Sequence, residues 1–391
     1  MDIAFCYESV LPERGGCETY IADLARMLVG DNHVVHLYAC RWDADSLPQQ
    51  MHYHRLDVPH FPRFFRPWRF GRACLRALRE HQHDVSIGFD KTWGQDVLYP
   101  QGGLHAACAA YNLEKHYHPL ARMAARCLKN LDPAFWSFLL LERQQYLISQ
   151  PPLIVVNSRM VQSHFQQFLG LPPDGIRIVP SAIDPDRFHL AEQPRRRLEW
   201  RKHWHIDESE TVGLFVAMNY RLKGLDPLLH AVRRLPTHVP FRLLVVGNRH
   251  KSHFERLAAR LGIARRVTFL GPVRDVQNCY FAADFLVHPT FYDPCSLVVL
   301  EALTCGLPVI TTRANGASEL LHPPMEGYVI DNPHDHDKLA WCIRQLFDPI
   351  RRKACSQAAR VTASRWTFAN HYRQLMQVLE EAAARRRQRA A

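Results

Sequence analysis

The sequence lacks the short motifs by which many nucleotide-binding and zinc proteins are recognised. It contains neither the G-x-G-x-x-G fingerprint of a dinucleotide-binding fold nor a G-x-x-x-x-G-K-[ST] phosphate loop. Its eleven cysteines form no C-x-x-C pair and no Cys/His spacing typical of a zinc site. These absences argue against a nicotinamide cofactor and a P-loop, and we expect reduced thiols in a cytoplasmic protein.

Long apolar runs are also missing. No stretch approaches the roughly 18–20 residues that a helix needs to cross a bilayer, and because the sequence opens directly on a strand pattern we expect a protein without a secretory signal. The chain shows no internal repeat and, apart from the basic tail Arg385–Arg389, no low-complexity segment. With 391 residues, 47% of them apolar and 22% charged, it is globular and long enough for two domains.

Basic residues outnumber acidic ones, and the formal net charge is +11. This excess favours a polyanionic partner, which is nucleic acid, anionic lipid or a phosphorylated substrate. One basic stretch, residues 62–79, interleaves arginines with aromatic residues: Arg63, Arg66, Arg69, Arg72, Arg76 and Arg79 with Phe64, Phe65, Trp68 and Phe70. Such a stretch suits an anionic membrane surface. The alternative is a solvated helix with an aromatic stripe that faces the core.

Short apolar runs alternate with amphipathic stretches along the whole chain. The runs predict buried parallel strands at Ile3–Tyr7, Val34–Ala39, Val85–Phe89, Leu153–Asn157, Val212–Met218, Phe241–Gly247, Val267–Leu270, Phe285–Pro289 and Pro308–Thr311. One face of the first helix carries Tyr20, Ile21, Leu24, Ala25 and Leu28. The alternation predicts an α/β protein with doubly wound sheets.

The helical pattern breaks at Leu171-Pro-Pro-Asp-Gly175, and a second α/β unit starts afresh at Val212. We therefore expect a first domain at residues 1–172 and a second at 173–365. The last helical stretch, within 366–391, has no strand after it, and we expect it to return to the first domain.

Two carboxylates mark the most informative segment, Phe291–Ile310. Asp293 stands in a loop, Glu301 follows inside an apolar helix pattern, and Ser296 and Leu297 lie where this helix should begin. Free N–H groups at a helix N-terminus bind anions, and a carboxylate accepts hydrogen bonds from hydroxyl groups. Phosphate together with vicinal hydroxyls describes a sugar nucleotide.

Two loops that follow strands carry further candidates. Arg221 and Lys223 lie between a strand and a helix, where they would neutralise a diphosphate, and the alternative is a solvated loop with two cations. In the first βα turn, Leu11-Pro-Glu-Arg-Gly-Gly-Cys-Glu18, Gly15 and Gly16 let backbone approach a ligand. His105, after Gln101-Gly102-Gly103, is either a proton-transfer group at the mouth of the first domain or an ordinary loop histidine.

Two acidic motifs resemble metal ligands on paper. Asp43-Ala-Asp45 has no other ligand nearby in the sequence, and His334-Asp-His-Asp337 fits a helix start better than a metal site. We expect no metal ion and no cofactor.

Taken together, these segments resemble the retaining GT-B glycosyltransferases of family 4. The two carboxylates eight residues apart before Ala302-x-x-x-Gly306-x-Pro308 match the family's donor-binding pattern, although Asp293 replaces the usual Glu. Gly15-Gly16-x-Glu18 matches its acceptor-side loop, Arg221-x-Lys223-Gly224 its diphosphate clamp, and Ala182–Phe188 the start of its second domain. Ile87–Val97 and Leu139–Tyr146 are most similar to the lipopolysaccharide-core glucosyltransferases.

The resemblance implies two Rossmann-like domains that face each other across a cleft. It implies that Arg221, Lys223 and the N–H groups of Ser296 and Leu297 hold the diphosphate, that Glu301 binds the ribose and that Asp293 binds the sugar. Gly15, Gly16 and Glu18 would face donor phosphate or acceptor, with Arg63, Arg66, Trp68 and Arg69 on the acceptor or membrane side. Relatives often carry an Asp in the loop that here reads Gln101-Gly102-Gly103, so either His105, which we favour, or Asp96 takes its place, or nothing does.

We therefore expect a retaining glycosyltransferase that moves a hexose, with glucose from UDP-glucose implied by the resemblance, onto a lipopolysaccharide-core or other glycolipid acceptor. His105, Arg221, Lys223 and Asp293 would be its catalytic residues. The protein would associate with the cytoplasmic face of the inner membrane and would not bind nucleic acid. The alternatives are a non-catalytic sugar-nucleotide-binding protein of the same fold, a GT-B phosphorylase and a basic nucleic-acid-binding protein.

Overall fold

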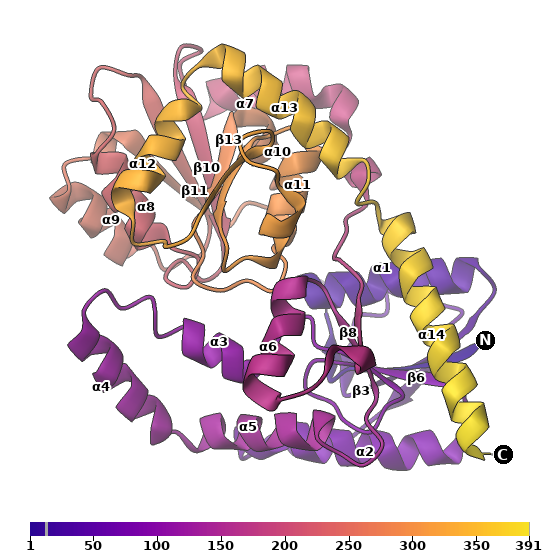
Figure 1. The fold of residues 1–391 in the computed structure, drawn as a ribbon. Helices are drawn as coiled ribbons and strands as arrows, with labels where there is room; N and C mark the ends of the chain where they lie inside the picture. The colour runs from indigo at the N-terminus through magenta and orange to yellow at the C-terminus, as the bar shows by residue number, and fades with distance from the viewer. Residues whose placement is uncertain (12–14, 391) are drawn as a thin grey trace. The chain divides into compact units, whose positions relative to one another are not determined.

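The computed structural model describes residues 1–11 and 15–390 and divides into two compact units. Unit 1 comprises Met1–Leu113, His118–Pro180 and the C-terminal residues from Ala369 onward, and unit 2 comprises Glu114–Tyr117 and Ser181–Phe368. Each unit is a parallel sheet covered by helices on both faces, as the alternating strand and helix patterns predict (Figure 1).

The sheet of unit 1 has seven strands, and all recorded pairings in it are parallel. From edge to edge they are β5 (His52–Arg55), β3 (Val34–Ala39), β1 (Asp2–Cys6), β6 (Val85–Phe89), β7 (Val97–Tyr99), β8 (Leu153–Val156) and β9 (Ile176–Ile178). The chain first builds outward from β1 through β3 to β5 and then adds β6 on the other side of β1. The strand order therefore reverses between β1 and β6.

Seven α-helices belong to unit 1 within the described residues. They are α1 (Gly16–Gly30), α2 (Arg66–Glu80), α3 (His105–Tyr111), α4 (Pro119–Asn130), α5 (Pro133–Tyr146), α6 (Arg159–Leu169) and α14 (Phe368–Ala390). The face predicted for α1 is buried, since Tyr20, Ile21, Leu24, Ala25 and Leu28 all lie in the core. A separate two-stranded pair joins β2 (Ser9–Val10) to β4 (Arg41–Trp42).

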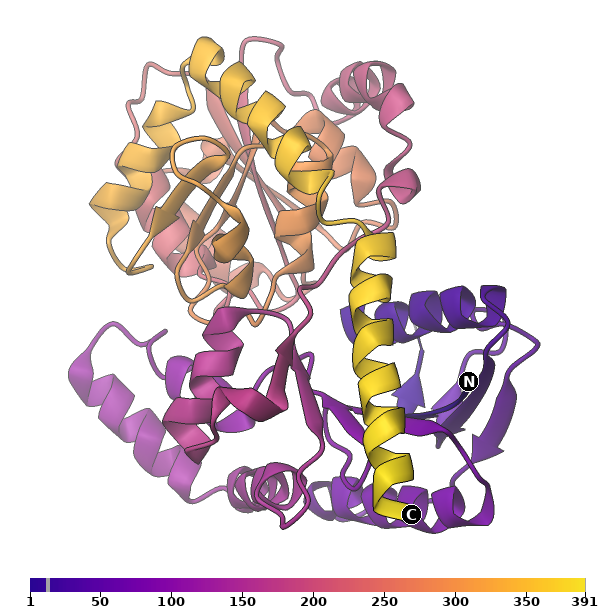
Figure 2. The ribbon, with the colours of Figure 1, turned by 45° about the vertical axis from the view of Figure 1, so that its right-hand side comes forward.

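The C-terminal helix α14 packs on unit 1, as expected (Figure 2). Near its start, His371 Nε2 lies 2.6 Å from the hydroxyl of Tyr20 in α1. Further along, Arg177 of β9 donates to both carboxylate oxygens of Glu381, at 3.0 and 2.7 Å. A buried hydrogen bond and a bidentate ion pair thus attach the last helix to the first domain.

The sheet of unit 2 has six parallel strands. In order across the sheet they are β12 (Val267–Gly271), β11 (Phe241–Gly247), β10 (Thr211–Ala217), β13 (Phe285–His288), β14 (Val309–Thr312) and β15 (Gly327–Ile330). Its α-helices are α7 (Gln193–His203), α8 (Leu225–Arg233), α9 (Ser252–Arg260), α10 (Gln277–Ala282), α11 (Leu297–Thr304), α12 (His336–Gln345) and α13 (Pro349–Ala363). Apolar clusters fill both faces of this sheet, and the strand order reverses between β10 and β13.

All nine predicted strands are present, and no strand end is displaced by more than one residue. The unpredicted strands are β2, β4, β5, β7, β9 and β15. Strand β5 reads His-Tyr-His-Arg and is at most half-buried, so it lacks the continuous apolar run that marked the central strands. No helix among the described residues is long and apolar enough to cross a membrane.

Candidate functional site

Each unit gathers polar side chains where its strand order reverses. In unit 2, the loop after β10 carries Arg221 and Lys223, and the loop after the neighbouring β13 carries Asp293. In unit 1, Tyr7 follows β1 and Asp90 follows the neighbouring β6. Open α/β sheets bind ligands beyond the carboxyl ends of strands at such a reversal, so each unit presents a candidate site at the expected edge.

Lys223 and Asp293 form an ion pair at this edge of unit 2. Lys223 Nζ lies 2.6 Å from Asp293 Oδ2 and donates to the carbonyl oxygen of Tyr292 at 3.0 Å. His288, the last residue of β13, places its Nε2 3.5 Å from the same Asp293 oxygen. The side chains of Lys223 and Asp293 are only 20% and 13% exposed, so the pair is largely shielded from solvent.

The charges of this cluster follow from its surroundings. Burial alone would raise the pKa of Asp293, but the Lys223 ammonium and the His288 imidazole hold it well below its usual range. Burial lowers the pKa of His288 in spite of the neighbouring Asp293 carboxylate. At neutral pH the cluster therefore contains a carboxylate, an ammonium and a neutral imidazole, which suits a ligand with both hydroxyl and phosphate groups.

Gly224 allows Lys223 to reach this position. Its φ of +81° lies in the left-handed region, and a Cβ added there would stand 2.0 Å from the carbonyl oxygen of Pro289. The loop after β10 therefore packs directly against the loop after β13 because residue 224 has no side chain. The Phe291 N–H donates to the Leu222 carbonyl at 2.9 Å and joins the same two loops.

Helix α11 begins as predicted, with Ser296 as its N-cap residue. The Ser296 N–H, however, donates to Asn315 Oδ1 at 3.2 Å, and this oxygen also accepts from the Ala317 N–H at 3.1 Å. Contrary to the prediction, Ser296 is thus not one of the free N–H donors at this helix start. Leu297, the first helical residue, has no partner for its N–H among the described residues.

Glu301 lies one turn into α11 and is half-buried. The Tyr280 hydroxyl of α10 donates to its Oε2 at 2.5 Å. Burial raises the pKa of Glu301, and the Tyr280 hydrogen bond and Arg187 oppose the rise. Tyr280 fixes one carboxylate oxygen, which leaves the second to accept hydrogen bonds from a ligand.

Arg221 differs from Lys223 although it stands two residues away. Its side chain is exposed and makes no hydrogen bond or ion pair within the part of the chain that the structure describes. The loop itself is ordered by Asn219, whose Oδ1 accepts from the Leu222 N–H at 3.1 Å. Arg221 is therefore the unpaired cation of the predicted diphosphate clamp, and Lys223 is its paired one.

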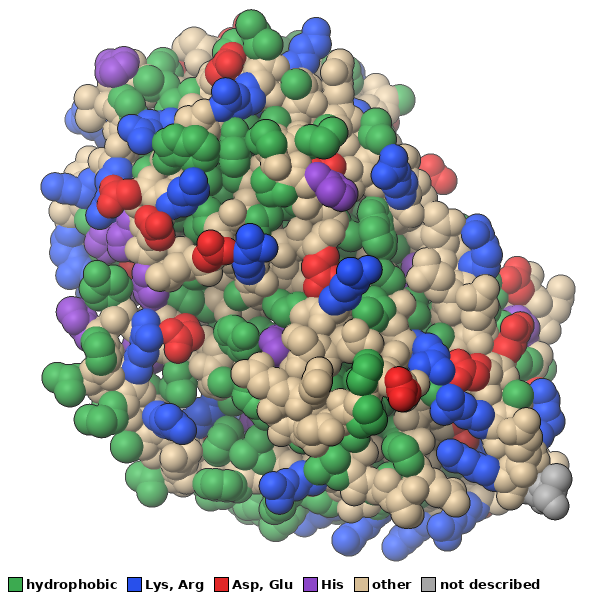
Figure 3. All heavy atoms as spheres, in the orientation of Figure 1, with side chains coloured by type: hydrophobic (Ala, Val, Ile, Leu, Met, Phe, Trp, Pro, Cys, Tyr) green, Lys and Arg blue, Asp and Glu red, His purple; other side chains and the backbone are tan. Residues whose placement is uncertain are grey.

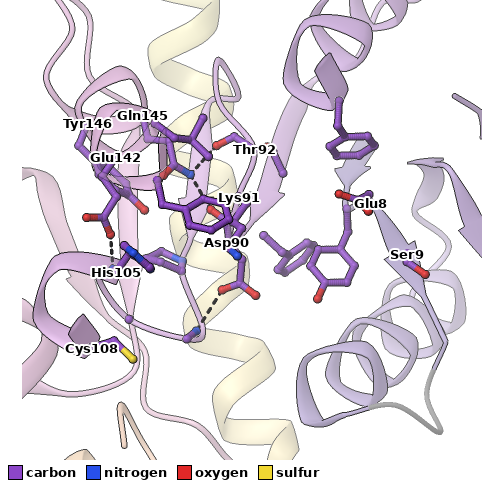
Figure 4. A pocket seen from close by; sticks show the side chains of 18 of the residues that line it. Glu8, Ser9, Asp90, Lys91, Thr92, His105, Cys108, Glu142, Gln145 and Tyr146 are labelled. Carbon is purple, nitrogen blue, oxygen red and sulfur yellow. Dashed lines mark hydrogen bonds between the residues drawn. The ribbon is translucent and has the colours of Figure 1, made fainter. Parts of the chain in front are cut away.

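Unit 1 holds a cavity of about 400 Å³ beyond the carboxyl ends of β1 and β6 (Figure 4). Its ionisable lining residues are Tyr7, Glu8, Glu18, Asp90, Lys91, His105, Cys108, Glu142 and Tyr146. A cavity of this size accommodates a small ligand. The structure thus brings two predicted residues, Glu18 and His105, to the same cavity.

Asp90 reaches into this cavity from the residue directly after β6 (Figure 4). The Gly102 N–H donates to its Oδ1 at 3.0 Å, and its φ of +52° lies in the left-handed region. Gln145 Nε2 holds this backbone by donating to the carbonyl oxygens of Asp90 and Thr92, at 2.5 and 2.6 Å. Such strain at a non-glycine residue costs of order 1–3 kcal/mol and is concentrated at functional sites.

The carboxylate of Asp90 lies against the Gln101-Gly102-Gly103 loop, which has no acid of its own. It contacts this loop directly, through the Gly102 N–H. Burial raises the pKa of Asp90, while the Gly102 N–H and the charge of Lys91 lower it. Asp96, one of the two predicted substitutes, does not line the cavity. It accepts hydrogen bonds from Ser86 and pairs with Arg386 of α14 at 2.9 Å.

His105, the other predicted substitute, stands in the cavity wall at the first position of α3. Its ring packs against Phe138 and Phe135, with centroids 5.1 and 6.0 Å apart, and its buried Nε2 has no hydrogen-bond partner among the described residues. Burial, together with Lys91 and Lys129, lowers its pKa to about 4. At neutral pH His105 is a neutral imidazole.

Glu142 of α5 caps the start of α3 (Figure 4). Its two carboxylate oxygens accept the backbone N–H groups of His105 and Ala106, the latter at 3.0 Å. The side chain is buried, and burial raises its pKa to about 7 although the two N–H groups and Lys91 oppose the rise. This carboxylate therefore fixes the backbone position of His105.

The predicted glycine turn does not need a glycine at residue 15 for its backbone conformation. Residues 12–14 lie outside the described residues, Gly15 is extended with φ of 177°, and Gly16 begins α1. A Cβ at Gly15 would meet Glu18 Oε2 at 3.0 Å. Backbone strain therefore does not require glycine at residue 15.

The basic stretch 62–79 forms a short 3-10 turn, Arg63–Phe65, followed by α2. Contrary to the membrane-facing prediction, Trp68 donates to Ser137 Oγ at 3.1 Å, and Phe70 is buried in the core. Arg66 Nε lies 3.0 Å from Glu8 Oε1 at the cavity, and Arg69 donates to the Phe61 carbonyl. The alternative prediction, a helix whose aromatic residues face the core, is thus confirmed for α2. Arg63, Phe65, Arg72, Arg76 and Arg79 are exposed.

The two acidic motifs have structural roles. Asp43 accepts from the Asp45 N–H at 3.3 Å and from the hydroxyl of Ser46 at 2.5 Å, which makes a turn. Asp335 is the N-cap of α12 and accepts from the Lys338 N–H at 2.9 Å. The predicted helix start at 334–337 is therefore confirmed.

His288, Asp90 and Glu142 were not assigned any role from the sequence. His288 and Asp90 stand at or directly after the end of a buried strand. Ligands of open α/β sheets bind beyond the carboxyl ends of the strands, and this signal could have identified both residues, as it identified Lys223. Glu142 carried no such signal, because its partners are backbone groups more than 35 residues away in the chain.

Comparison with known proteins accounts for this arrangement. The fold matches the crystal structure of WaaG, a glycosyltransferase involved in lipopolysaccharide biosynthesis, with a TM-score of 0.81 and 26% identity over 96% of this chain and 99% of that one. The family description "Glycosyltransferase Family 4" matches residues 14–187, and "Glycosyl transferases group 1" matches residues 196–362. The chain belongs to the GT-B glycosyltransferases. The group 1 match covers Lys223, Asp293 and Glu301, and the Family 4 match covers the lining of the unit 1 cavity from Glu18 onward.

Individual glycosyltransferases align along most of the chain. The lipopolysaccharide glucosyltransferase WaaG of Escherichia coli (strain K12) is 27% identical over 355 residues, which are 90% of this chain and 91% of WaaG. A D-inositol 3-phosphate glycosyltransferase of Acidothermus cellulolyticus is 29% identical over 419 residues, 96% of this chain and 87% of the relative. The relatives thus share the enzyme class but differ in the acceptor that their names state.

Proposed function

We propose that this glycosyltransferase moves glucose from UDP-glucose, with retention at the anomeric carbon, onto a lipopolysaccharide-core or other glycolipid acceptor. The observation that carries the proposal is the cluster of Lys223, Asp293 and His288 at the strand-order reversal of unit 2. It combines a cation for phosphate oxygens with a carboxylate for sugar hydroxyls. The likeness to the glucosyltransferase WaaG supports glucose and a glycolipid acceptor.

On the donor side, four groups have complementary tasks. Arg221 and Lys223 neutralise the diphosphate, assisted by the Leu297 N–H at the start of α11. The free oxygen of Glu301 accepts hydrogen bonds from the ribose hydroxyls, while Tyr280 holds the other oxygen. The positive charge on the leaving group's side thus comes from Arg221 and Lys223, and the proposal involves no metal ion and no cofactor.

The reaction breaks the bond between the glucose C1 and the β-phosphate oxygen. The electron pair of this bond stays on the UDP oxygen, whose developing charge Arg221, Lys223 and the helix start stabilise. The acceptor hydroxyl forms its bond to C1 from the face that UDP leaves, and its proton passes to the departing phosphate. Asp293 orients the sugar through its hydroxyl groups and does not act as a nucleophile, in contrast to the carboxylates of retaining glycosidases.

On the acceptor side, the cavity of unit 1 holds the accepting hydroxyl. Asp90 accepts a hydrogen bond from it, and neutral His105 offers Nε2 or its N–H to a neighbouring hydroxyl. A sugar-nucleotide-binding protein without activity was an alternative because the Gln101-Gly102-Gly103 loop has no acid. The carboxylate that Asp90 places against this loop favours the enzyme.

A membrane-bound acceptor is supported by the surface of unit 1. Helix α4 and the residue after it expose Leu120, Met123, Leu128 and Leu131 to between 61% and 78%, and residues 119–131 contain Arg122, Arg126 and Lys129 but no acidic residue. Hydrophobic and basic side chains gather over α4, and further basic ones over α2 (Figure 3). Exposed apolar side chains beside cations suit an anionic lipid interface. We propose that this surface associates with the cytoplasmic face of the inner membrane.

The function is tested with the full chain, UDP-[¹³C]glucose and a lipopolysaccharide-core acceptor. NMR of the first product should show an α-glucosidic bond, because UDP-glucose is an α-glycoside. A thermal-shift screen with UDP-, GDP- and ADP-glucose should give the largest rise with UDP-glucose. A β product would refute retention, and a larger shift with another nucleotide would refute the donor. Failure to glucosylate any lipid acceptor while UDP-glucose binds would favour the non-catalytic alternative.

A further inference from the structure

Unit 1 gathers histidines on the α2-covered face of its sheet, at the amino ends of the strands and away from the cavity. The histidine cluster consists of His36 (β3), His52 and His54 (β5), and His81 and His83 (between α2 and β6), with Asp2 at the start of β1. The ring centroid of His36 lies 4.6 Å from that of His52 and 4.6 Å from that of His83. Imidazole is the commonest metal ligand in proteins, so the question is whether these side chains converge.

Two of these histidines, His36 and His83, converge on one point with Asp2. His83 Nδ1 lies 2.5 Å from Asp2 Oδ1, and His36 Nε2 lies 3.3 Å from Asp2 Oδ2. All three ligand atoms lie within 4.8 Å of one another, and within residues 1–11 and 15–390 no other group of His, Cys, Asp or Glu side chains does so. Ligand atoms about 2.0–2.1 Å from a tetrahedral zinc ion stand roughly 3.3 Å apart. The spacing therefore approaches that of a metal-binding triad.

The other ring nitrogens are supported as metal-bound histidines usually are. The Tyr38 hydroxyl lies 2.8 Å from His83 Nε2, and His54 Nε2 lies 2.9 Å from His36 Nδ1. If Nδ1 of His83 and Nε2 of His36 bind a metal, the ring protons move to the opposite nitrogens and are donated to Tyr38 and His54. Both tautomers of each ring are thus hydrogen-bonded, and outer partners of this kind tighten metal sites.

The three side chains of the triad differ in how far they are exposed to solvent. The carboxylate that faces the rings is Asp2, whose side chain is 33% exposed, against 13% for His36 and 1% for His83. One partly exposed carboxylate beside two shielded imidazole nitrogens is a set of ligands that Zn²⁺ accepts in proteins.

We propose that Asp2, His36 and His83 bind a divalent transition-metal ion of the Zn²⁺ type. The ion would join the start of β1, the middle of β3 and the segment that enters β6, which are neighbours in the sheet. It would lie at the opposite end of the strands from Tyr7 and Asp90. The site therefore stabilises unit 1 and takes no part in glycosyl transfer.

Zn²⁺ and Co²⁺ binding to the full chain test this site. The wild-type protein should bind one Zn²⁺ that survives competition with a chromophoric chelator, and Co²⁺ should give the visible absorption of a nitrogen- and oxygen-ligated ion. Zn²⁺ should also raise the melting temperature, because it binds the folded state only. His36→Gln and His83→Gln should each remove the Zn²⁺-dependent rise, and Tyr38→Phe should weaken binding about 10-fold or more.

His230→Gln is the matched control. His230 also stacks on a histidine, His336, and lies 3.7 Å from Asp226, but this group does not converge on one point. The variant should keep the bound Zn²⁺ and the full thermal shift. A wild-type chain that retains no Zn²⁺ against the chelator, or a Zn²⁺ shift that persists in both His36→Gln and His83→Gln, would overturn the proposal. Zn²⁺ retention by the wild-type chain does not depend on any variant, so it can overturn the proposal even if a variant does not fold.

Discussion

Lys223 Nζ lies 2.6 Å from Asp293 Oδ2, so the ammonium assigned to the diphosphate is already paired with the carboxylate assigned to the sugar. Both side chains are largely shielded from solvent. Removing one member of such a pair leaves the other uncompensated. Replacing Lys223 should therefore weaken the binding of the phosphate groups, whereas replacing Asp293 should weaken the binding of the sugar.

Lys223→Ala and Asp293→Asn separate these effects. Lys223→Ala should lower the transfer rate about 100-fold or more, because one stabilising cation is lost from the leaving group. Asp293→Asn should bind UDP about as tightly as the wild type or more tightly, because Lys223 is no longer neutralised, yet it should transfer glucose poorly. Calorimetry with UDP and with UDP-glucose measures both. Equal losses of UDP affinity in the two variants would contradict this division of roles.

Asp90→Asn should impair the use of the acceptor and spare the donor. The asparagine oxygen can still accept the Gly102 N–H, so the loop should keep its position, but the side chain no longer carries a negative charge. We expect kcat/KM for the acceptor to fall about 100-fold, while slow hydrolysis of UDP-glucose continues at the wild-type rate. Parallel assays of transfer and hydrolysis check this. If both fall together, Asp90 acts on the donor or on the fold.

The buried carboxyl of Glu142 makes stability depend on pH. Its pKa in the folded protein is about 7, against 4.5 ordinarily, so between these values the folded state holds a proton that the unfolded state releases. The stability it contributes is full below about pH 4.5 and is lost as the pH rises through 7, by roughly 3 kcal/mol in all. Urea unfolding of wild type and Glu142→Gln from pH 5 to 8 measures the difference. A wild type that gains stability relative to the variant as pH rises would contradict it.

The central strands were predictable because they are buried on both faces. A parallel strand between two helix layers can be apolar at every position, as in Leu153–Val156, and such a run is visible without knowledge of its neighbours. Strand β9, Ile-Arg-Ile, offers no such run, and its arginine finds Glu381 only through the return of the last helix. Edge strands are stabilised by partners far away in the sequence, and the local sequence pattern does not reveal those partners.

The same limit applies to the site. Lys223 and Asp293 were predictable as residues after strands, but their ion pair spans 70 positions and needs the glycine at 224. Asp90 was overlooked because its carboxylate serves a loop twelve residues away. Trp68 was misplaced because a dense basic and aromatic stretch does not reveal that Ser137 lies beside it. Side-chain partners follow from the packing of elements, and the sequence indicates mainly the elements.

Gly224→Ala should destabilise unit 2 by several kcal/mol. The left-handed backbone alone costs about 1–3 kcal/mol for a non-glycine residue, and the new Cβ would also stand 2.0 Å from the Pro289 carbonyl oxygen. Gly262→Ala is the matched control, since its φ of +71° imposes the same backbone cost but no atom lies within 4 Å of the added Cβ. Urea unfolding should show the larger loss at 224. Equal losses would mean that the two loops do not pack as closely as described.

Vesicle binding should depend on the exposed apolar side chains of α4. Leu120→Ser combined with Met123→Ser should weaken sedimentation with anionic vesicles about 10-fold or more, since burying one such side chain contributes about 1.5–3 kcal/mol. Binding of the wild type should also fall as salt rises from 0.05 to 0.5 M, because the arginines of this surface act through screened charge. Ile350→Ser serves as the control, since Ile350 is 81% exposed but belongs to unit 2. Equal losses in Ile350→Ser and the α4 variant, or no wild-type binding at low salt, would refute α4 as the lipid-binding surface.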